Sequence, residues 1–299
     1  MQTLHEIRGL LQAARLHPQR RFGQCFLIDK NLMSKVLDLA GLTGAETVLE
    51  VGPGTGSLTE ELLERSAKVV AVEIDRGLVE LLRRTLAGRD KLVLIHGDVL
   101  AGKNELSPAV LEALDGPVDL VSNLPYNIAT PLVGQCLKLS WRSACRGMDR
   151  PVCFRRLTFT VQREVAGRMT APPGSGDYGP ISVLAALLAR LTVGPVVPAS
   201  AFWPAPKVQS RILRIDFDAS AAAQVADQEL LSEVVATAFQ QRRKQIGSVA
   251  RRTGRRWTEG LFRAGLEQAE IDPATRPEQL GPWQYRALAN ALVIGSKMG

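Results

Sequence analysis

The chain has 299 residues, 45% of them hydrophobic, which is enough to bury a full core and to form one large domain beside a smaller one. It has no apolar run of about 18 residues, and its first residues lack the apolar core and small-residue cleavage site of a secretory signal, so membrane insertion and secretion are disfavoured. The formal net charge of +7 favours a polyanionic partner.

Residues 1–29 are expected to form a helical arm that precedes the first long strand. Its arginines, together with few acids, would also suit a mitochondrial transit segment. His5, Glu6 and the immediate entry into motif-like sequence favour the arm. We therefore expect a cytoplasmic protein, with a mitochondrial one as the alternative.

Five short runs rich in β-branched residues alternate with longer amphipathic stretches. The runs span residues 47–51, 68–73, 92–95, 118–122 and 157–162. The amphipathic stretches span residues 57–66, 76–87, 106–115 and 129–141. Nearly continuous apolar strands that alternate with helices are typical of a parallel sheet covered on both faces. The sequence thus predicts a doubly wound α/β domain.

A glycine-rich turn follows the first strand at Gly52, Gly54 and Gly56, and a helix is expected from Ser57. Glycine permits close backbone approach, and helix-terminal N–H groups face whatever binds there. The spacing G-x-G-x-G differs from the G-x-G-x-x-G of dinucleotide-binding proteins, which disfavours a nicotinamide enzyme.

Two acidic residues follow the next two strands. Glu73 lies about 20 residues after the turn, where a carboxylate accepts hydrogen bonds from both hydroxyls of a ribose. Asp98 follows the third strand and is placed to accept a hydrogen bond from an adenine amine. A helix N-cap or a surface position is the alternative for either acid alone. In register with the glycine turn, they predict an adenosine pocket.

The segment that begins at Asn123 follows the fourth strand and suits an aromatic exocyclic amine as substrate. The side-chain oxygen of Asn123 and the backbone carbonyl of Leu124 would accept its two N–H bonds and aim the nitrogen lone pair at an electrophile. Tyr126 would stack on one face of the base, and a residue of the Phe202-Trp203 pair, with Phe202 as our candidate, on the other.

Pro125 fixes the backbone and removes a competing donor at this point. The alternatives are an ordinary turn for Asn123–Tyr126 and core packing for each aromatic residue. The catalytic candidates are Asn123, Leu124, Pro125, Tyr126 and Phe202.

The later part of the chain changes in character. Residues 142–156 are basic and aperiodic and are expected to form a surface loop, and residues 210–217 to form a last strand at the edge of the sheet. Beyond them the chain is alanine-rich and helical in period, so we expect a domain of residues 1–218, including the arm, and a helical domain of residues 219–299. Its helices are expected near residues 228–252, 258–267 and 283–294.

A run of seven cations without an acid lies at residues 242–256 and begins within the first of these expected helices. Like charges in so short a stretch repel each other, and such a run favours phosphates as partners, the alternative being a solvated helix face. The predicted contact residues are Arg242, Arg243, Lys244, Arg251 and Arg252.

Four cysteines form no C-x-x-C pair and lie far in sequence from the three histidines. This argues against both zinc and a disulfide framework, so Cys25, Cys136, Cys145 and Cys153 are expected to be free thiols and no metal is predicted.

With these residues in hand, the chain closely resembles the small-subunit ribosomal RNA adenine dimethyltransferases, the KsgA family, from about residue 20 to residue 294. The matching blocks are RFGQCFL, LEVGPGTGSLT, VEID, GDVL, NLPYNIATPL, QREVAGRM, DYGPISV, FWPAPKVQS, AFQQRRKQI and IDPATRPEQL. The last two lie outside the general methyltransferase core and are specific to the family.

The resemblance implies a Rossmann-like methyltransferase domain with a small all-helical RNA-binding domain. It also implies that S-adenosylmethionine is the cofactor and that two methyl groups go to the exocyclic amine of each of two adjacent adenosines near the 3′ end of small-subunit rRNA. Cofactor contacts are expected at Gln24, Cys25, Leu27, Gly52, Gly54, Gly56, Glu73, Ile74, Asp98, Val99 and Asn123. Position 25 is usually asparagine in the family, and Cys25 lacks a strong hydrogen-bonding group.

Two alternatives stay open. Large-subunit rRNA adenine methylases of the antibiotic-resistance type share the catalytic motif, whereas the two last blocks favour the small-subunit enzymes. A non-catalytic rRNA-binding assembly factor, or a mitochondrial transcription factor built on this fold, would keep the basic run without needing an intact site. We expect a monomer that acts on the small ribosomal subunit or its precursor.

Overall fold

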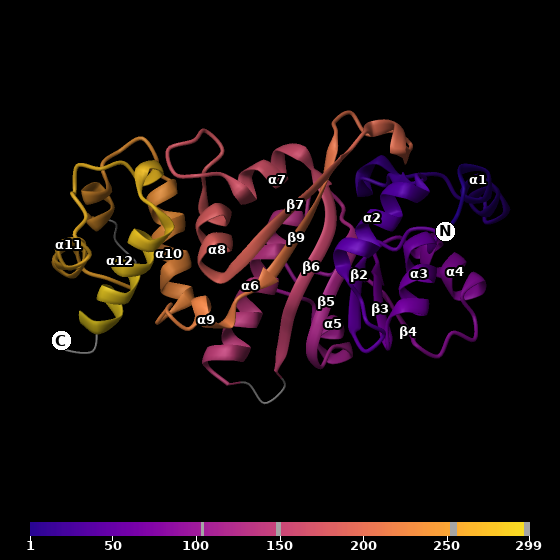
Figure 1. Cartoon of the computed structure of the whole chain (residues 1–299), viewed down its shortest axis with the longest axis horizontal. Coiled ribbons are helices and arrows are strands. Elements are labelled where there is room, and N and C mark those ends of the chain that lie inside the picture. The colour runs from indigo at the N-terminus through magenta and orange to yellow at the C-terminus, as the bar shows by residue number, and fades with distance from the viewer. Residues whose placement is uncertain (103–104, 148–150, 252–255, 296–299) are drawn as a thin grey trace. The chain divides into compact units, whose positions relative to one another are not determined.

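The computed structural model describes residues 1–299 except 103–104, 148–150, 252–255 and 296–299. In this part of the chain, seven strands form the main sheet, in the order β4-β3-β2-β5-β6-β9-β7 (Figure 1). Their bounds are β2 (Thr47–Val51), β3 (Lys68–Glu73), β4 (Leu92–His96), β5 (Gly116–Asn123), β6 (Val152–Gln162), β7 (Ala189–Val197) and β9 (Ser210–Phe217). Strands β2 to β6 are parallel to one another, and β9 runs antiparallel to β6. The predicted doubly wound α/β fold is confirmed.

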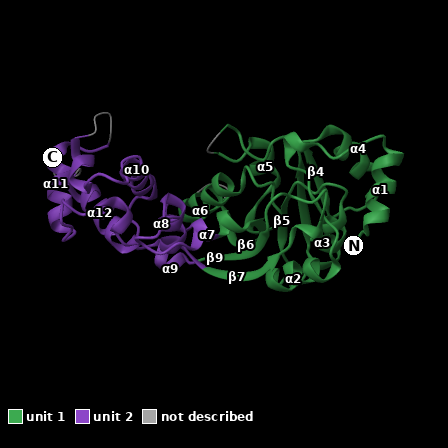
Figure 2. Ribbon diagram, turned by 90° about the horizontal axis from the view of Figure 1, so that it is seen from above, with its two compact units in different colours: residues 1–143, 147–166, 191–217 green, residues 144–146, 167–190, 218–299 purple. Residues whose placement is uncertain are grey.

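The central strands are apolar on both faces because helices cover both faces. Val48 and Leu49 on β2, and Leu120 and Val121 on β5, are fully buried, and burial of each such side chain contributes about 1.5–3 kcal/mol. The flanking helices are α2 (Lys30–Ala40), α3 (Ser57–Arg65), α4 (Arg76–Thr85), α5 (Pro108–Ala113) and α6 (Ala129–Cys145). Figure 2 shows α5 and α2 on opposite sides of the strands.

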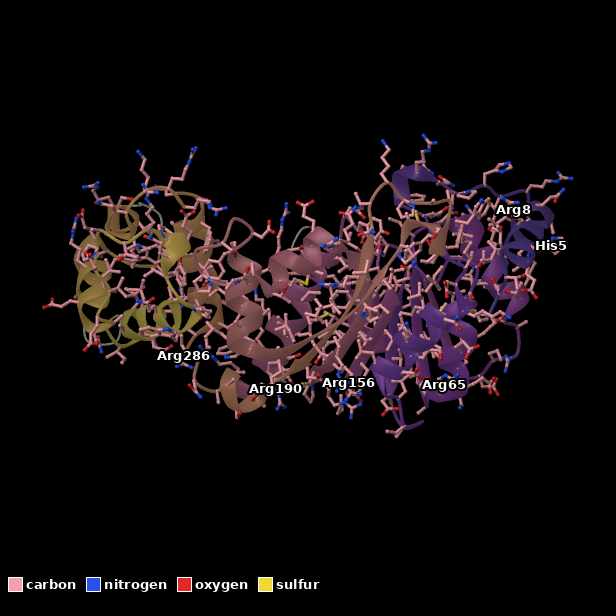
Figure 3. All side chains as sticks on the ribbon, turned by 45° about the horizontal axis from the view of Figure 1, so that its top comes forward. His5, Arg8, Arg65, Arg156, Arg190 and Arg286 are labelled. Carbon is pink, nitrogen blue, oxygen red and sulfur yellow. The ribbon has the colours of Figure 1, made fainter. Side chains whose placement is uncertain are left out.

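The arm begins with helix α1 (Leu4–Ala13), which Thr3 and Glu6 start with a capping box. Its apolar face packs Ile7 and Leu11 against Phe26 and α4. After the short helix η1 (Arg20–Phe22), strand β1 (Phe26–Leu27) pairs antiparallel with β8 (Phe202–Trp203), which follows the short helix η2 (Ala199–Ala201). On α1, Arg8, labelled in Figure 3, lies 5.1 Å from the centre of the Trp203 ring. The arm thus contacts the sheet domain at both of its ends, through the packing of α1 and through the pairing of β1 with β8.

Two expectations for the sheet are wrong. Strand β9 is not at the edge, because β7, which we did not predict, lies outside it. One of the arginines that suggested an edge is held by partners: Arg214 pairs with Asp216 at 2.7 Å and donates to the Leu39 carbonyl at 2.9 Å. Residues 142–156 are not one loop either, since α6 continues to Cys145 and β6 begins at Val152.

The chain divides into two compact units. Unit 1 contains residues 1–143, 147–166 and 191–217, and unit 2 contains residues 144–146, 167–190 and 218–299 (Figure 2). Sequence patterns place a boundary near residue 218; the units part between Phe217 and Asp218, and residues 167–190 join the helical unit.

Unit 2 is built from helices. They are the end of α7 (Arg163–Thr170), then α8 (Pro180–Leu188), α9 (Ala219–Ala222), α10 (Gln228–Phe239), η3 (Ile246–Arg251), α11 (Glu259–Gln268), η4 (Pro277–Gln279) and α12 (Pro282–Gly295). In its core the ring of Phe239 lies 5.7 Å from Tyr178 and 6.0 Å from Tyr285, centre to centre. The Tyr178 hydroxyl donates to the Leu280 carbonyl at 2.9 Å, so the segment before α8 is anchored to the C-terminal helices.

The helix expected over residues 228–252 is also wrong, because α10 ends at Phe239. Beyond it the backbone N–H of Ile246 donates to the Thr275 carbonyl at 2.8 Å, and that of Gly247 to the Pro273 carbonyl at 2.9 Å. These bonds to a distant segment replace the helical ones, so the first cations of the basic run lie in a turn. Helices α11 and α12 lie where they are expected.

Candidate active site

A cavity opens at the carboxyl ends of β2, β3, β4 and β5, where the order of the sheet reverses around β2. It encloses about 1120 Å³ when the space open to solvent is counted. This is where open α/β sheets bind their ligands. The predicted residues that line it are Gln24, Cys25, Leu27, Gly52, Gly54, Glu73, Ile74, Asp98, Val99, Asn123, Leu124, Pro125 and Tyr126. Gly56 and Phe202 are not among its lining residues.

The glycine turn needs its glycines for conformation and for contact. Gly52, Gly54 and Gly56 have φ values of 70°, 63° and 90°, in the region that side chains disfavour. A Cβ on Gly54 would lie 2.9 Å from the Phe26 ring, and one on Gly56 would lie 2.9 Å from Leu82. Gly54 therefore lets the arm close over the turn, whereas Gly56 serves the packing of α3 against α4.

Glu73 ends strand β3 and links the turn to the next loop. Its side chain is only 3% exposed, and its two oxygens accept from the backbone N–H groups of Gly54 at 3.2 Å and Asp75 at 2.9 Å. Burial raises the pKa of this carboxyl group. Each oxygen keeps a lone pair for a ligand in the cavity.

Glu50 on β2 also lines the cavity, and we did not predict it. It is 2% exposed, and its Oε2 has no hydrogen-bond partner among the residues that the structure describes. Burial raises the pKa of this carboxyl group to about 8. The signal was present in the sequence: a carboxylate inside the apolar run TVLEV, directly before the glycine turn.

Asp98 and Gln24 differ in how free their polar groups are. Asp98 is exposed, and one of its oxygens accepts from the Leu100 backbone N–H at 2.9 Å. The amide of Gln24 is engaged at both ends, since it donates to Asp75 at 3.0 Å and accepts from the Gln19 backbone N–H at 2.7 Å. Gln24 thus holds the arm in place beside the cavity through its two hydrogen bonds. Asp98 has a second carboxylate oxygen that can accept a hydrogen bond from a ligand.

The side chain of Asn123 is held by two contacts at the end of β5. Its Nδ2 donates to the backbone carbonyl of Cys25 at 2.9 Å, and its Oδ1 accepts from the Thr160 hydroxyl. Cys25 contributes through its backbone, which any residue would supply. Its thiol is half-buried, and burial raises its pKa, so the thiol is neutral near pH 7.

The aromatic candidates have different surroundings. Tyr126 is half-buried, and its hydroxyl lies 2.8 Å from the Ser210 hydroxyl. Phe202 is 2% exposed and packs in the hydrophobic cluster that contains Leu27 and Met33. Because Phe202 is buried and does not line the cavity, the structure does not support its stacking on a base. Its neighbour Trp203 already stacks on Phe26, with ring centres 6.3 Å apart.

The predicted phosphate-contacting residues lie in unit 2, and they differ in how they are held. Arg242 pairs with Glu278 at 2.7 Å and donates to the carbonyls of Ser175 and Gly176. Arg243, Lys244 and Arg251 are exposed and, together with Arg242, line an open concavity that also includes Gln240, Gln241 and Ser248. Arg252 lies outside the described residues.

Three further observations concern the described part of the chain. The four cysteines are free. In that part, no group of three or more His, Cys, Asp or Glu residues is placed to hold a metal ion. No helix there has both the length and the apolar character that a membrane crossing requires.

The sheet is that of the Rossmann-like methyltransferases. The model of the family described as ribosomal RNA adenine dimethylase matches residues 16–275, and the chain therefore belongs to that family. A relative from Magnetococcus marinus is 39% identical over 287 residues, covering 95% of each chain, and one from Phenylobacterium zucineum is 39% identical over 293 residues, covering 97% of this chain and 94% of its own. Both are named ribosomal RNA small subunit methyltransferase A.

Two solved structures resemble this chain. A dimethyladenosine transferase from Plasmodium falciparum superposes with a TM-score of 0.66 at 22% identity, covering 88% of this chain and 95% of its own, and supports the fold. The 23S rRNA methyltransferase ErmE superposes with a TM-score of 0.61 at 27% identity, covering 90% of this chain and 99% of its own.

Proposed function

We propose that this protein transfers methyl groups from S-adenosylmethionine to the exocyclic amines of two adjacent adenosines near the 3′ end of small-subunit rRNA, two to each. The observation that carries the proposal is that Asn123 and Tyr126 line the same cavity as Glu73 and Asp98. A site for an amine therefore adjoins a site for a nucleoside. Family membership and the names of the relatives support the choice of adenine in rRNA.

The residues of the cavity fit S-adenosylmethionine. The two oxygens of Glu73 suit a ribose diol, the open oxygen of Asp98 suits an adenine amine, and the unpartnered Oε2 of Glu50 suits an ammonium group. Gly52 and Gly54 let Pro125 and Phe26 pack closely against the turn that lines this cavity. When bound, this cofactor supplies a methyl group that is already activated on a sulfonium centre.

The residues of the chain then have to bind and orient the target. Asn123 through Oδ1 and Leu124 through its backbone carbonyl accept the two N–H bonds of the adenine amine, and Tyr126 stacks on the base. This arrangement would turn the nitrogen lone pair out of conjugation with the ring and aim it at the sulfonium methyl group of a bound cofactor. The C–S bond would break as the N–C bond forms, a neutral thioether would leave, and the amine would then release its extra proton to solvent. Positioning supplies most of the rate, and no strong base is needed.

Unit 2 adds affinity for the RNA backbone. Arg243, Lys244 and Arg251 neutralise phosphates, an interaction that is independent of sequence. We further propose that the protein acts as a monomer in the cytoplasm, on the small subunit or its precursor.

The test is to incubate the protein with labelled S-adenosylmethionine and under-methylated small ribosomal subunits, and to map the label in the rRNA. We expect dimethyladenosine at two adjacent positions near the 3′ end. Label in large-subunit rRNA instead would favour the antibiotic-resistance type of methylase. Tight binding to the small subunit without any label would favour a non-catalytic assembly factor.

A further inference from the structure

Two hydroxyl groups on neighbouring strands contact the two side chains that are proposed to handle the target base. Thr160 on β6 lies opposite Asn123 in the parallel register and donates to its Oδ1. Ser210 begins β9, and its hydroxyl lies 2.8 Å from that of Tyr126. Both residues are fully buried, and neither lines the cavity.

We propose that Thr160 and Ser210 are positioning residues for methyl transfer, Thr160 through the amide of Asn123 and Ser210 through the ring of Tyr126. This inference rests on the proposed function. It adds two residues that touch neither the cofactor nor the base.

The contacts of Asn123 leave its amide one favourable orientation. If the amide were flipped, its oxygen would face the Cys25 carbonyl, and two acceptors would oppose each other. In the observed orientation the Thr160 hydroxyl takes one lone pair of Oδ1 and fixes its direction, while the second lone pair stays available. A preset acceptor needs no reorganisation when the amine arrives.

Tyr126 needs external support because it lies beyond the end of β5, outside regular structure. Its ring is held by the bond to Ser210, a residue of the strand that pairs with β6. Burial raises the pKa of Tyr126, so its hydroxyl is neutral, and either hydroxyl can donate in this bond. The segment with the catalytic candidates is therefore tied to β6 through Asn123 and to β9 through Tyr126.

The first test compares three substitutions on β6. Thr160→Val keeps the shape and removes the hydroxyl, and Thr160→Ser keeps the hydroxyl. Thr158→Val is the matched control: Thr158 is equally buried, lies two residues away on the same face, and its hydroxyl has no hydrogen-bond partner among the described residues. Methyl transfer to small subunits is measured at saturating and limiting cofactor, and each variant is checked by thermal melting.

We expect Thr160→Val to lower kcat by about 10- to 100-fold with the KM for cofactor nearly unchanged, because loss of orientation costs rate rather than binding. Thr160→Ser should restore most of the rate, and Thr158→Val should match the wild type. Equal rates for Thr160→Val and Thr158→Val would overturn the role of Thr160, as would a change confined to KM. A wild-type protein that labels no small-subunit rRNA would instead contradict the proposed function itself.

The second test is a double-mutant cycle on Tyr126 and Ser210. Tyr126→Phe and Ser210→Ala should each lower kcat by about tenfold, the value of one well-formed hydrogen bond. In the Tyr126→Phe background, Ser210→Ala should cause no further loss, because the bond is already absent. Independent, multiplying losses would show that Ser210 acts through another contact and would overturn this half of the proposal.

Discussion

Glu50 is an ionisable residue inside an apolar strand, and its titration opposes folding. Its pKa is about 8 in the folded protein against an ordinary value of 4.5. Between these pH values the native state keeps a proton that the unfolded chain releases. The contribution of Glu50 to the free energy of unfolding is therefore fully present below about pH 4.5 and is lost as the pH rises toward 8. At pH 7 this loss amounts to about 3 kcal/mol.

We therefore expect Glu50→Gln to stabilise the cofactor-free protein relative to the wild type at pH 7, and the advantage to shrink toward zero near pH 4.5. Denaturant unfolding of both proteins from pH 5 to pH 8 measures the difference. A difference that does not change with pH would contradict the assignment. The same variant should bind S-adenosylmethionine more weakly, because the Glu50 carboxyl group can lose its proton to face the ammonium group, whereas an amide cannot ionise.

At Asn123 the expected effect is on chemistry rather than on binding of the RNA. Asn123→Ala removes the proposed acceptor and also frees the Cys25 carbonyl and the Thr160 hydroxyl. We expect methyl transfer to fall below detection while the affinity for small subunits stays within about twofold, because unit 2 supplies the phosphate contacts. Filter binding and label incorporation give the two values, and retained dimethylation would disprove the role of Asn123.

The turn between β2 and α3 requires glycine because of its backbone conformation and its close packing, not because of a side-chain group. Gly54→Ala would force a side chain into the left-handed region and place its Cβ 2.9 Å from the Phe26 ring. We expect it to destabilise the protein by about 1–3 kcal/mol and to weaken cofactor binding at least tenfold, because the arm and the turn must separate.

Gly134→Ala is the matched control for this prediction. Gly134 lies within α6, and a Cβ there would meet no atom within 4 Å. Helix propensity predicts that it stabilises the protein by about 0.5–1 kcal/mol. Thermal melting and calorimetric titration with S-adenosylmethionine separate the two variants. Similar behaviour would show that the turn tolerates a side chain.

The elements that the sequence predicts are those whose pattern is local. The five parallel strands are nearly continuous apolar runs, and the polar residues at their ends meet because parallel strands end at one edge. Strand β7 is not predictable in this way, because it is half exposed and contains Gly194 and Pro195. Gly194 is needed there since a Cβ would lie 3.0 Å from Ile212 on β9, a contact that only the folded sheet creates.

In the candidate site too, some residues can be predicted from a local sequence pattern, and others depend on contacts that only the fold creates. Glu73, Asp98 and Asn123 lie at or just after the ends of strands and can be recognised in the sequence, whereas the contacts of Thr160 and Ser210 depend on strand register. The short pairing of β1 with β8 places Phe202 opposite Leu27, in the core rather than in the cavity, and no periodicity in the sequence encodes that pairing.

For the molecule as a whole, the excess positive charge favours RNA binding only where a cation is not paired with an acidic side chain. Among the seven cations of residues 242–256, Arg242 and Arg256 pair with Glu278 and Asp227, each at 2.7 Å. Arg242 therefore holds the end of α10 to the segments at 175–176 and 278 within unit 2. Net charge alone overstates the number of cations available to RNA.

Substitution of a cation that is paired with an acid should therefore affect stability, whereas substitution of an exposed cation should affect RNA binding. Arg243→Ala and Lys244→Ala should each reduce the slope of log affinity for small subunits against log salt by about one, with unchanged melting, because each removes one phosphate contact. Arg242→Ala should lower the melting temperature and leave the salt slope unchanged, because it breaks an ion pair inside unit 2. Binding measured at several salt concentrations, with melting curves, distinguishes them. If Arg242→Ala reduced the slope as much as Arg243→Ala, Arg242 would release Glu278 to bind RNA, and its role would be that of a phosphate contact.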